Sequence, residues 1–348
     1  MRITLIDDSI SFDGNTPKNR PLGGAEKAFV YLSEALAERD HEVVSINRCA
    51  SYCELNGVTW LPWHAPRPPE SDVLIAFRRP ALLQEVGDVD RKLLWLWGAA
   101  SLLEKADNQK LLERYMPTIV YLGEVHRRGW KPWRSFQEAI IPPGIGDAYL
   151  GFETDQVEPE PVAIITTHPL HGMDQLLQLW LKHIRSGNNE AQLHIYSAAL
   201  IRGKETGYIV PSLKHFLSKV MNLENHGVSI KTPLADWAMA EVYGGVKLHL
   251  YPIIKTEMYG CTLAESQATG LPAVVRGASE GNFGAMAERV CDGQTGYIAP
   301  DDSAFVNLSN RILAGKSEIY WSLHKDALAL QRQRSWQLVA SEFEALWS

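Results

Sequence analysis

Two glutamates bracket a glycine in the second half of this 348-residue chain. Glu257 and Glu265 flank Gly260 and Thr262 in the segment TEMYGCTLAESQATGLP. A glycine lets a ligand approach the backbone closely, and the amides of Cys261 and Thr262, at the start of a predicted helix, attract an anion. Carboxylates accept hydrogen bonds from sugar hydroxyls. The segment therefore predicts a site for a polyhydroxylated diphosphate ester.

This segment resembles the donor site of the retaining GT-B glycosyltransferases of family 4, which carries the pattern E-x7-E. Ala268, Gly270 and Pro272 match the A-x-G-x-P sequence that commonly follows it. The resemblance implies that Glu257 is catalytic and faces the donor sugar, and that Glu265 binds the nucleotide ribose. It also implies further donor-binding residues: Tyr259, Gly260, Cys261 and Thr262.

The resemblance extends over most of the chain. Gly23 and Gly24 resemble a glycine loop that follows the first strand and binds the donor diphosphate, although a Gly-Gly pair is also typical of an ordinary turn. Pro143-Gly144-Ile145 resembles a turn at the domain junction, and Asp292–Tyr297 a late loop of the second domain. Trp336 matches the S-W-x pattern of a terminal helix that returns to the first domain.

One loop departs from the family pattern. Relatives carry an arginine and a lysine after the first strand of the second domain, where this chain has Thr166 and His171. The resemblance implies that His171 is catalytic and that Thr167, His168 and Gly172 bind donor, because a protonated imidazole donates to phosphate. Three alternatives stay open: His168 and His171 are ordinary core or surface histidines, the protein binds donor poorly, or another cation replaces the pair. The candidate cations are Arg202, Lys204, Lys255 and Arg276.

A second departure lies on the acceptor side. Trp97-Gly98 stands where many relatives have His-Asp. Trp97, Glu124 and His126 are the candidate acceptor-side residues, and an aromatic pocket suits an apolar or sugar-stacking acceptor. The alternative is that Trp95 and Trp97 are core residues. The basic and aromatic segment 126–134 is typical either of weak contact with a membrane or an anionic acceptor, or of a solvated loop.

The elements that position these residues alternate between strands and helices. Apolar runs predict strands at 2–6, 42–46, 72–77, 92–97 and 118–122, then at 162–166, 192–196, 247–251 and 271–275. Helical spacing follows Gly24, Leu102, Met173 and Thr262, and the C-terminal stretch 319–347 is amphipathic. This order predicts α/β domains with parallel sheets, whose ligands bind at the carboxyl ends of the strands.

We therefore expect two Rossmann-like domains facing across a cleft, the GT-B fold. The predicted first domain is 1–150, an acidic, proline-bearing linker spans 151–161, and the donor domain is 162–324. A helix at about 325–348 is expected to pack back on the first domain.

Composition narrows the class of protein. The formal net charge of −7 argues against a nucleic-acid partner. The chain contains no apolar run of membrane-spanning length and no signal-peptide pattern, so we expect a cytoplasmic protein with reduced cysteines. Asp88-Val-Asp90 spells the D-x-D metal motif of another glycosyltransferase architecture, but it precedes a predicted strand, and no metal is expected.

The expected function is retaining, metal-independent sugar transfer from a nucleotide-diphosphate sugar, with no other cofactor. The acceptor is a saccharide, a lipid-linked group or a small molecule. The alternatives are a sugar-nucleotide epimerase, a phosphorylase, and a non-catalytic module that binds sugar nucleotides. A nicotinamide dehydrogenase is disfavoured because no G-x-G-x-x-G follows the first strand.

Overall fold

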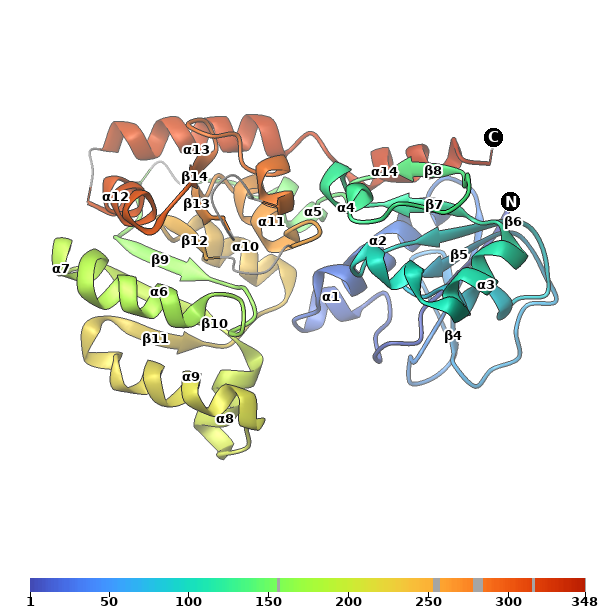
Figure 1. Cartoon of the computed structure of the whole chain (residues 1–348), viewed down its shortest axis with the longest axis horizontal. Coiled ribbons are helices and arrows are strands. Elements are labelled where there is room, and N and C mark those ends of the chain that lie inside the picture. Colours follow the sequence, from blue (N-terminus) through green and yellow to red (C-terminus); the bar gives the residue numbers. More distant parts are fainter. Residues whose placement is uncertain (155–156, 253–256, 278–283, 315–316, 348) are drawn as a thin grey trace. The chain divides into compact units, whose positions relative to one another are not determined.

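The computed structural model describes residues 1–348 except 155–156, 253–256, 278–283, 315–316 and 348. The chain divides into two compact units, each described here by itself (Figure 1). The first comprises Met1–Gly146 and Arg334–Ser348, and the second comprises Asp147–Gln333. The division thus falls at 146/147 and 333/334, whereas the sequence suggested 150/151 and 324/325.

The described residues of the first unit form an eight-stranded sheet in the order β3-β4-β2-β1-β5-β6-β7-β8. Its pairings are parallel, except that β3 runs antiparallel to β4. Parallel sheets are buried on both faces, and β1 follows this rule because Ile3 to Ile6 are buried along the whole strand. The strands are β1 (Arg2–Ile6), β2 (Glu42–Asn47), β3 (Cys53–Leu55), β4 (Val58–Pro62), β5 (Glu70–Phe77), β6 (Asp88–Trp95), β7 (Thr118–Tyr121) and β8 (Glu138–Ile140).

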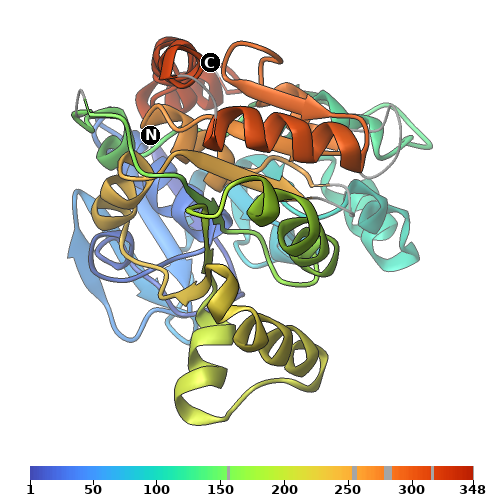
Figure 2. The ribbon, with the colours of Figure 1, turned by 90° about the vertical axis from the view of Figure 1, so that its left-hand side faces the viewer.

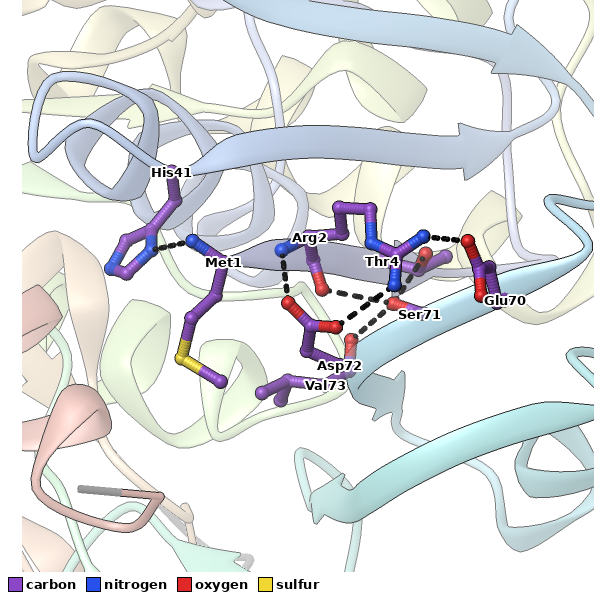
Figure 3. Close-up of polar contacts among 8 residues, drawn as sticks. All are labelled: Met1, Arg2, Thr4, His41, Glu70, Ser71, Asp72 and Val73. Atoms are coloured by element: carbon purple, nitrogen blue, oxygen red, sulfur yellow. Dashed lines mark hydrogen bonds and ion pairs between the residues drawn. The ribbon is translucent and has the colours of Figure 1, made fainter.

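Side chains tie β1 to β5 at the amino ends of these strands (Figure 3). The amide of Arg2 donates to Oδ2 of Asp72 over 2.7 Å, and its guanidinium contacts Glu70 and Asp72. The hydroxyls of Thr4 and Ser71 lie 3.0 Å apart. These bonds fix the register in which Ile3 pairs with Val73, so residues at the opposite, carboxyl ends of both strands also come together.

Helix α2 (Gly24–Ala37) connects β1 to β2, and α3 (Ala106–Tyr115) and α4 (Glu124–Arg128) flank β7 in sequence. Helix α14 (Trp336–Glu344), from the end of the chain, contacts α2. A Cβ on Gly144 would lie 2.9 Å from Cδ2 of Trp336, and Ile145 forms a β-bridge with Ser335. The terminal helix therefore belongs to the core of the first unit.

The described part of the second unit holds a six-stranded sheet in the order β11-β10-β9-β12-β13-β14, and its described strands pair in parallel. Helices α8 (Ala198–Thr206) and α9 (Pro211–Asn222) lie beside the edge strand β11, and α12 (Asp302–Leu313) contacts β12, β13 and β14 (Figures 1 and 2). The strands are β9 (Val162–Ile165), β10 (Gln192–Tyr196), β11 (Val228–Lys231), β12 (Leu248–Pro252), β13 (Ala273–Arg276) and β14 (Gly296–Ala299).

Three more helices frame the candidate site. Helix α6 (Met173–Leu179) follows β9 and continues into a π-helical turn at Trp180–Ile184, α10 (Asp236–Gly244) precedes β12, and α11 (Cys261–Ala268) lies between β12 and β13. The predicted C-terminal helical stretch is divided into α13 (Ser317–Gln331) and α14. The α/β class with parallel sheets is confirmed. Within the described residues, no helix combines the length and apolar content needed to cross a membrane.

Candidate active site

The start of α11 depends on Gly260. Gly260 adopts φ +81° at the helix N-cap, a left-handed conformation that favours glycine. A Cβ at this position would lie 2.7 Å from Cε of Met286. The helical bonds begin here, because the amides of Leu263 and Ala264 both donate to the Gly260 carbonyl over 3.1 Å. The glycine and helix start that the sequence indicated thus coincide in space.

Glu257 lies next to the loop that follows β9. Its Oε1 atom is 3.2 Å from Nδ1 of His171, and the two side chains are 26% and 29% exposed, so a ligand can reach both. The structure thus brings together the two residues predicted to be catalytic, although they are separated by 86 positions.

Glu265 lies in the second turn of α11 and is only 8% exposed. Its negative charge acts on two buried tyrosines, Tyr149 and Tyr251. The pKa of each phenol is raised well above its usual value, first by burial and then by neighbouring carboxylates, with Glu257 the larger contributor at Tyr251. Both phenols therefore remain neutral hydrogen-bond donors. The carboxylate of Glu265 is held in a largely desolvated position near the helix start.

A buried histidine connects β12, the loop after β9, and α11. Nε2 of His249 lies 3.0 Å from Oγ1 of Thr166, and its Nδ1 lies 2.8 Å from Oγ of Ser266. Thr166 in turn lies 2.9 Å from the hydroxyl of Thr262. Burial lowers the pKa of His249 to about 3, so the ring is neutral and binds the two hydroxyls. The sequence analysis missed His249; the signal for it was a histidine inside the apolar run Leu248–Tyr251.

The loop 166–172 contains the remaining predicted donor residues of this unit. Thr167 is buried, and its hydroxyl has no hydrogen-bond partner among the described residues. His168 is exposed, and its ring centroid lies 5.6 Å from that of His171. Gly172 adopts φ +86°, and a Cβ there would clash with the carbonyl of Pro252. The loop therefore packs against the end of β12, as a glycine at this position permits.

The candidate replacement cations are engaged elsewhere or lie outside the described residues. Lys204 pairs with Glu224 over 2.6 Å, and Arg276 donates to Asp302 over 3.0 Å. Arg202 lies over the ring of Tyr208, 5.2 Å from its centroid. Lys255 lies outside the described residues.

The sequence analysis also missed Arg289. Its guanidinium carbon lies 4.5 Å from the centroid of Tyr259, and its Nη1 donates to the Tyr259 hydroxyl over 3.2 Å. The Nε atom is buried without a hydrogen-bond partner in the described part of the chain. This arginine therefore supplies positive charge beside the loop that bears Glu257.

In the first unit, Gly23 caps α2 and Gly24 begins it. A Cβ on Gly23 would clash with the carboxylate of Glu26, which therefore folds back over the first turn of the helix. A glutamate here suits the positive end of the helix. Oε1 of Glu26 also accepts a 2.6 Å bond from Arg78.

The predicted acceptor-side residues differ in their surroundings. Trp95 is fully buried against Phe343, with centroids 5.1 Å apart, so it is a core residue. Trp97 is half-buried and follows β6. His126 is 1% exposed; its Nε2 lies 2.8 Å from the Gly98 carbonyl and its Nδ1 accepts from the Leu122 amide over 3.2 Å. Burial lowers the pKa of His126. Glu124 is exposed and pairs with Arg127 over 3.4 Å.

Two other sequence features are also placed. Asp88 and Asp90 are exposed at the amino end of β6, and no cluster of His, Cys, Asp or Glu suited to a metal ion occurs among the described residues. In the segment 126–134, Trp130 is buried in the core, and the exposed Trp133 packs on it with a centroid distance of 5.8 Å. The aromatic side chains of this segment thus pack locally.

Comparison with known proteins places these features in context. Residues 162–314 match the family described as Glycosyl transferases group 1. No curated protein sequence matches the chain.

Solved structures share its fold. Sucrose-phosphate synthase from Thermosynechococcus elongatus is 13% identical over 100% of this chain and 98% of that protein, with a TM-score of 0.72. WaaG, a glycosyltransferase involved in lipopolysaccharide biosynthesis, is 12% identical over 99% of both chains, with a TM-score of 0.71. HepE from Anabaena, solved with UDP and glucose, is 14% identical over 99% of both chains, with a TM-score of 0.72.

Proposed function

We propose that the protein is a GT-B glycosyltransferase that transfers a sugar from a nucleotide-diphosphate sugar to an acceptor; residues 162–314 match the family Glycosyl transferases group 1, and the whole chain shares its fold with solved structures that include the glycosyltransferase WaaG. The proposal includes retention of anomeric configuration and independence of metal ions. It also includes a role for Glu257 and His171 at the reacting centre.

The observation that carries this proposal is the pairing of Glu257 with His171 beside the start of α11. In the proposed complex, Glu257 accepts hydrogen bonds from donor-sugar hydroxyls and Glu265 binds the ribose. The departing diphosphate gains negative charge, which His171 and the first amides of α11 offset. In the protonated imidazole both ring nitrogens donate, so His171 can bond to Glu257 through Nδ1 and to phosphate through Nε2.

UDP-glucose is the donor we propose to test first. The Anabaena HepE structures contain UDP or UDP-glucose, and an Escherichia coli structure contains UDP-2-fluoro glucose. These proteins share the fold with this chain at 10–15% identity. A binding screen should therefore add GDP-, ADP- and dTDP-sugars.

The proposal is tested by donor binding and turnover in two variants. A donor at 100 times its Kd is expected to stabilise the protein by about 2.7 kcal/mol. Glu257→Gln and Glu265→Gln should each reduce kcat/KM for donor by about 10- to 100-fold, because each removes a charged hydrogen-bond acceptor. Glu241→Gln, on an exposed position of α10, is the control. Wild-type kinetics in both variants would reject the site.

A second candidate is a sugar-nucleotide-binding module without transferase activity. It is favoured by Thr166, which stands where family 4 carries an arginine and therefore supplies no positive charge for the diphosphate. The Thr166 hydroxyl is instead hydrogen-bonded to Thr262 and His249. This candidate predicts donor binding with neither transfer nor donor hydrolysis.

A further inference from the structure

Three neighbouring strands of the first unit lead into residues that have an unsatisfied buried polar atom. The strands are β1, β5 and β6, which lie side by side in the sheet. The residues are Asp7, Arg78 and Trp97. Asp7 Oδ1, Arg78 Nε and Trp97 Nε1 are buried, and none has a hydrogen-bond partner within the described residues. Buried polar groups are nearly always paired, so three unpaired polar atoms at the carboxyl ends of neighbouring strands point to a ligand.

Each of the two charged residues is held firmly by its other polar atoms. Asp7 is 1% exposed, and its Oδ2 accepts from the Ser9 hydroxyl. The pKa of Asp7 is raised, chiefly by burial and also by the charges of Glu26 and Asp8, although the Ser9 bond and the charge of Arg78 lower it. Arg78 adopts φ +69°, which is unusual for a residue other than glycine, and it donates through Nη2 to Glu26 over 2.6 Å. Backbone strain of this kind is concentrated at functional sites.

Trp97 contributes a neutral donor to the same edge. Its ring packs against Phe77 with a centroid distance of 5.5 Å, and the guanidinium carbon of Arg78 lies 4.9 Å from the centroid of the same Phe77 ring. Arg78 and Trp97 are thus both anchored on one aromatic residue.

The charges at this edge disfavour an anionic ligand. Three carboxylates, those of Asp7, Asp8 and Glu26, lie here with the guanidinium groups of Arg78, Arg79 and Arg48, the last of which donates through Nε to the Asp8 carbonyl over 2.8 Å. Arg78 pairs with Glu26, and Arg79 pairs with Asp8 over 2.7 Å. Of the three carboxylates, that of Asp7 has no ion pair within the described residues, and a phosphate or carboxylate placed beside it would be repelled. A hydroxyl group meets no such penalty, because it donates to Oδ1 of Asp7 while accepting from Nε of Arg78 or Nε1 of Trp97.

We propose that Asp7, Arg78 and Trp97 bind the hydroxyl groups of an uncharged, hydroxyl-rich acceptor, and that Asp7 excludes anionic acceptors. This inference rests on the proposed sugar transfer, because it names the class of acceptor for that reaction. It assigns acceptor recognition to these three residues rather than to Glu124 and His126, whose side chains bond within the first unit.

The test compares neutral and phosphorylated acceptors with the full-length protein and the donor selected by the binding screen. Glucose with glucose 6-phosphate, and glycerol with glycerol 3-phosphate, are the two pairs of probes. Wild type is expected to favour the neutral member at least tenfold in acceptor kcat/KM. Asp7→Asn places an amide donor where Oδ1 accepts, so kcat/KM for the neutral acceptor should fall at least tenfold. The ratio of kcat/KM for the neutral acceptor to that for the phosphorylated acceptor should fall as well.

Asp90→Asn is the control, because it makes the same change on an exposed carboxylate at the amino end of β6, at the opposite ends of the strands from Asp7. It should alter the acceptor kcat/KM less than threefold. Trp97→Phe keeps an aromatic ring against Phe77 and removes only the indole donor. It should raise the acceptor KM about threefold to tenfold without changing donor KM.

Two further measurements separate acceptor binding from a structural role and from the proposed function. Because Asp7 is a buried and only partly satisfied acid, Asp7→Asn should have an equal or higher Tm while it loses transfer. Donor hydrolysis without acceptor should stay at the wild-type rate. Three results, each obtained with normal donor hydrolysis, would overturn the acceptor inference. Wild type could use the phosphorylated and neutral acceptors equally well, it could use neither, or Asp7→Asn could transfer sugar as wild type does. If no sugar nucleotide binds or reacts, the proposed function itself fails.

Discussion

Nδ1 of His171 lies 3.2 Å from Oε1 of Glu257, across 86 positions of sequence. The pair joins the loop after β9 to the residues that precede α11, so a change in either side chain affects the position of the other. By the resemblance to glycosyltransferase family 4, His171 stands where a lysine is expected. Under the proposed function, the carboxylate orients the imidazole and the imidazole donates to the leaving group.

Replacing His171 tests this arrangement. His171→Ala should lower donor kcat/KM about 100-fold, because a preorganised donor to a developing anion contributes about 3 kcal/mol. His171→Lys should recover at least tenfold of that loss, since an ammonium group supplies the same charge. The measurement is steady-state turnover of UDP-glucose, with His183→Ala on the exposed π-helical turn as control. Wild-type turnover by the alanine variant would remove His171 from the mechanism.

Gly260→Ala should disturb the start of α11. The residue would be held at φ +81° and its Cβ would lie 2.7 Å from Cε of Met286, which together should cost about 2–4 kcal/mol in the free energy of unfolding. Gly207→Ala is the matched control, because Gly207 has φ +72° with no atom near its Cβ position. Chemical denaturation should show a smaller loss, about 1–2 kcal/mol, for that control.

Adding Met286→Ala to Gly260→Ala separates the two causes. Removal of the Met286 side chain relieves the clash but leaves the backbone strain. A double variant no more stable than expected from two independent losses would show that the contact with Met286 does not matter.

Strands formed by short apolar runs were predictable from the sequence. β1 and β10 have the bounds that their patterns indicated, because Ile3 to Ile6 in β1 and Leu193 and Ile195 in β10 are buried within parallel sheets. The start of β6 was less visible, since Asp88, Asp90 and Arg91 are exposed at its polar amino end. Trp97 continued the apolar run beyond the strand, which ends at Trp95.

The break between α13 and α14 has one local signal, Ser335, whose side chain accepts from the Leu338 amide at the N-cap of α14, and tertiary bonds reinforce it. Arg332 donates to the carbonyls of Ala268 and Phe152 over 2.8 and 2.6 Å, and Arg334 donates to the carbonyl of Pro142. Tertiary bonds also explain why His249 and Arg78 were missed. Their partners Thr166 and Glu26 lie 83 and 52 positions away, and no local spacing records such contacts.

His249 predicts a specific loss of stability in acid. The pKa of His249 is about 3 in the folded protein and about 6.5 in the unfolded chain. The unfolded state therefore binds more protons between these values, so stability falls as the pH drops from about 6.5 towards 3. Between pH 7 and pH 5 this group alone should cost about 2 kcal/mol. The free energy of unfolding, measured by urea denaturation at each pH, should fall by about 2 kcal/mol less between pH 7 and pH 5 in His249→Gln than in wild type. An equal fall in both proteins would contradict the assignment.

Trp336 should be essential to the first unit although it lies near the end of the chain. It is 7% exposed, and its ring packs on Tyr31 and Trp95 with centroid distances of 6.0 and 6.4 Å. Trp336→Ala should lower the free energy of unfolding by about 3–5 kcal/mol, because a large cavity would form. Trp237→Ala, at a tryptophan that is 65% exposed, should change it by less than about 0.5 kcal/mol. Hydrogen exchange should localise the first effect to β6 and α2, which hold Trp95 and Tyr31; equal, small losses in both variants would show that α14 does not stabilise this core.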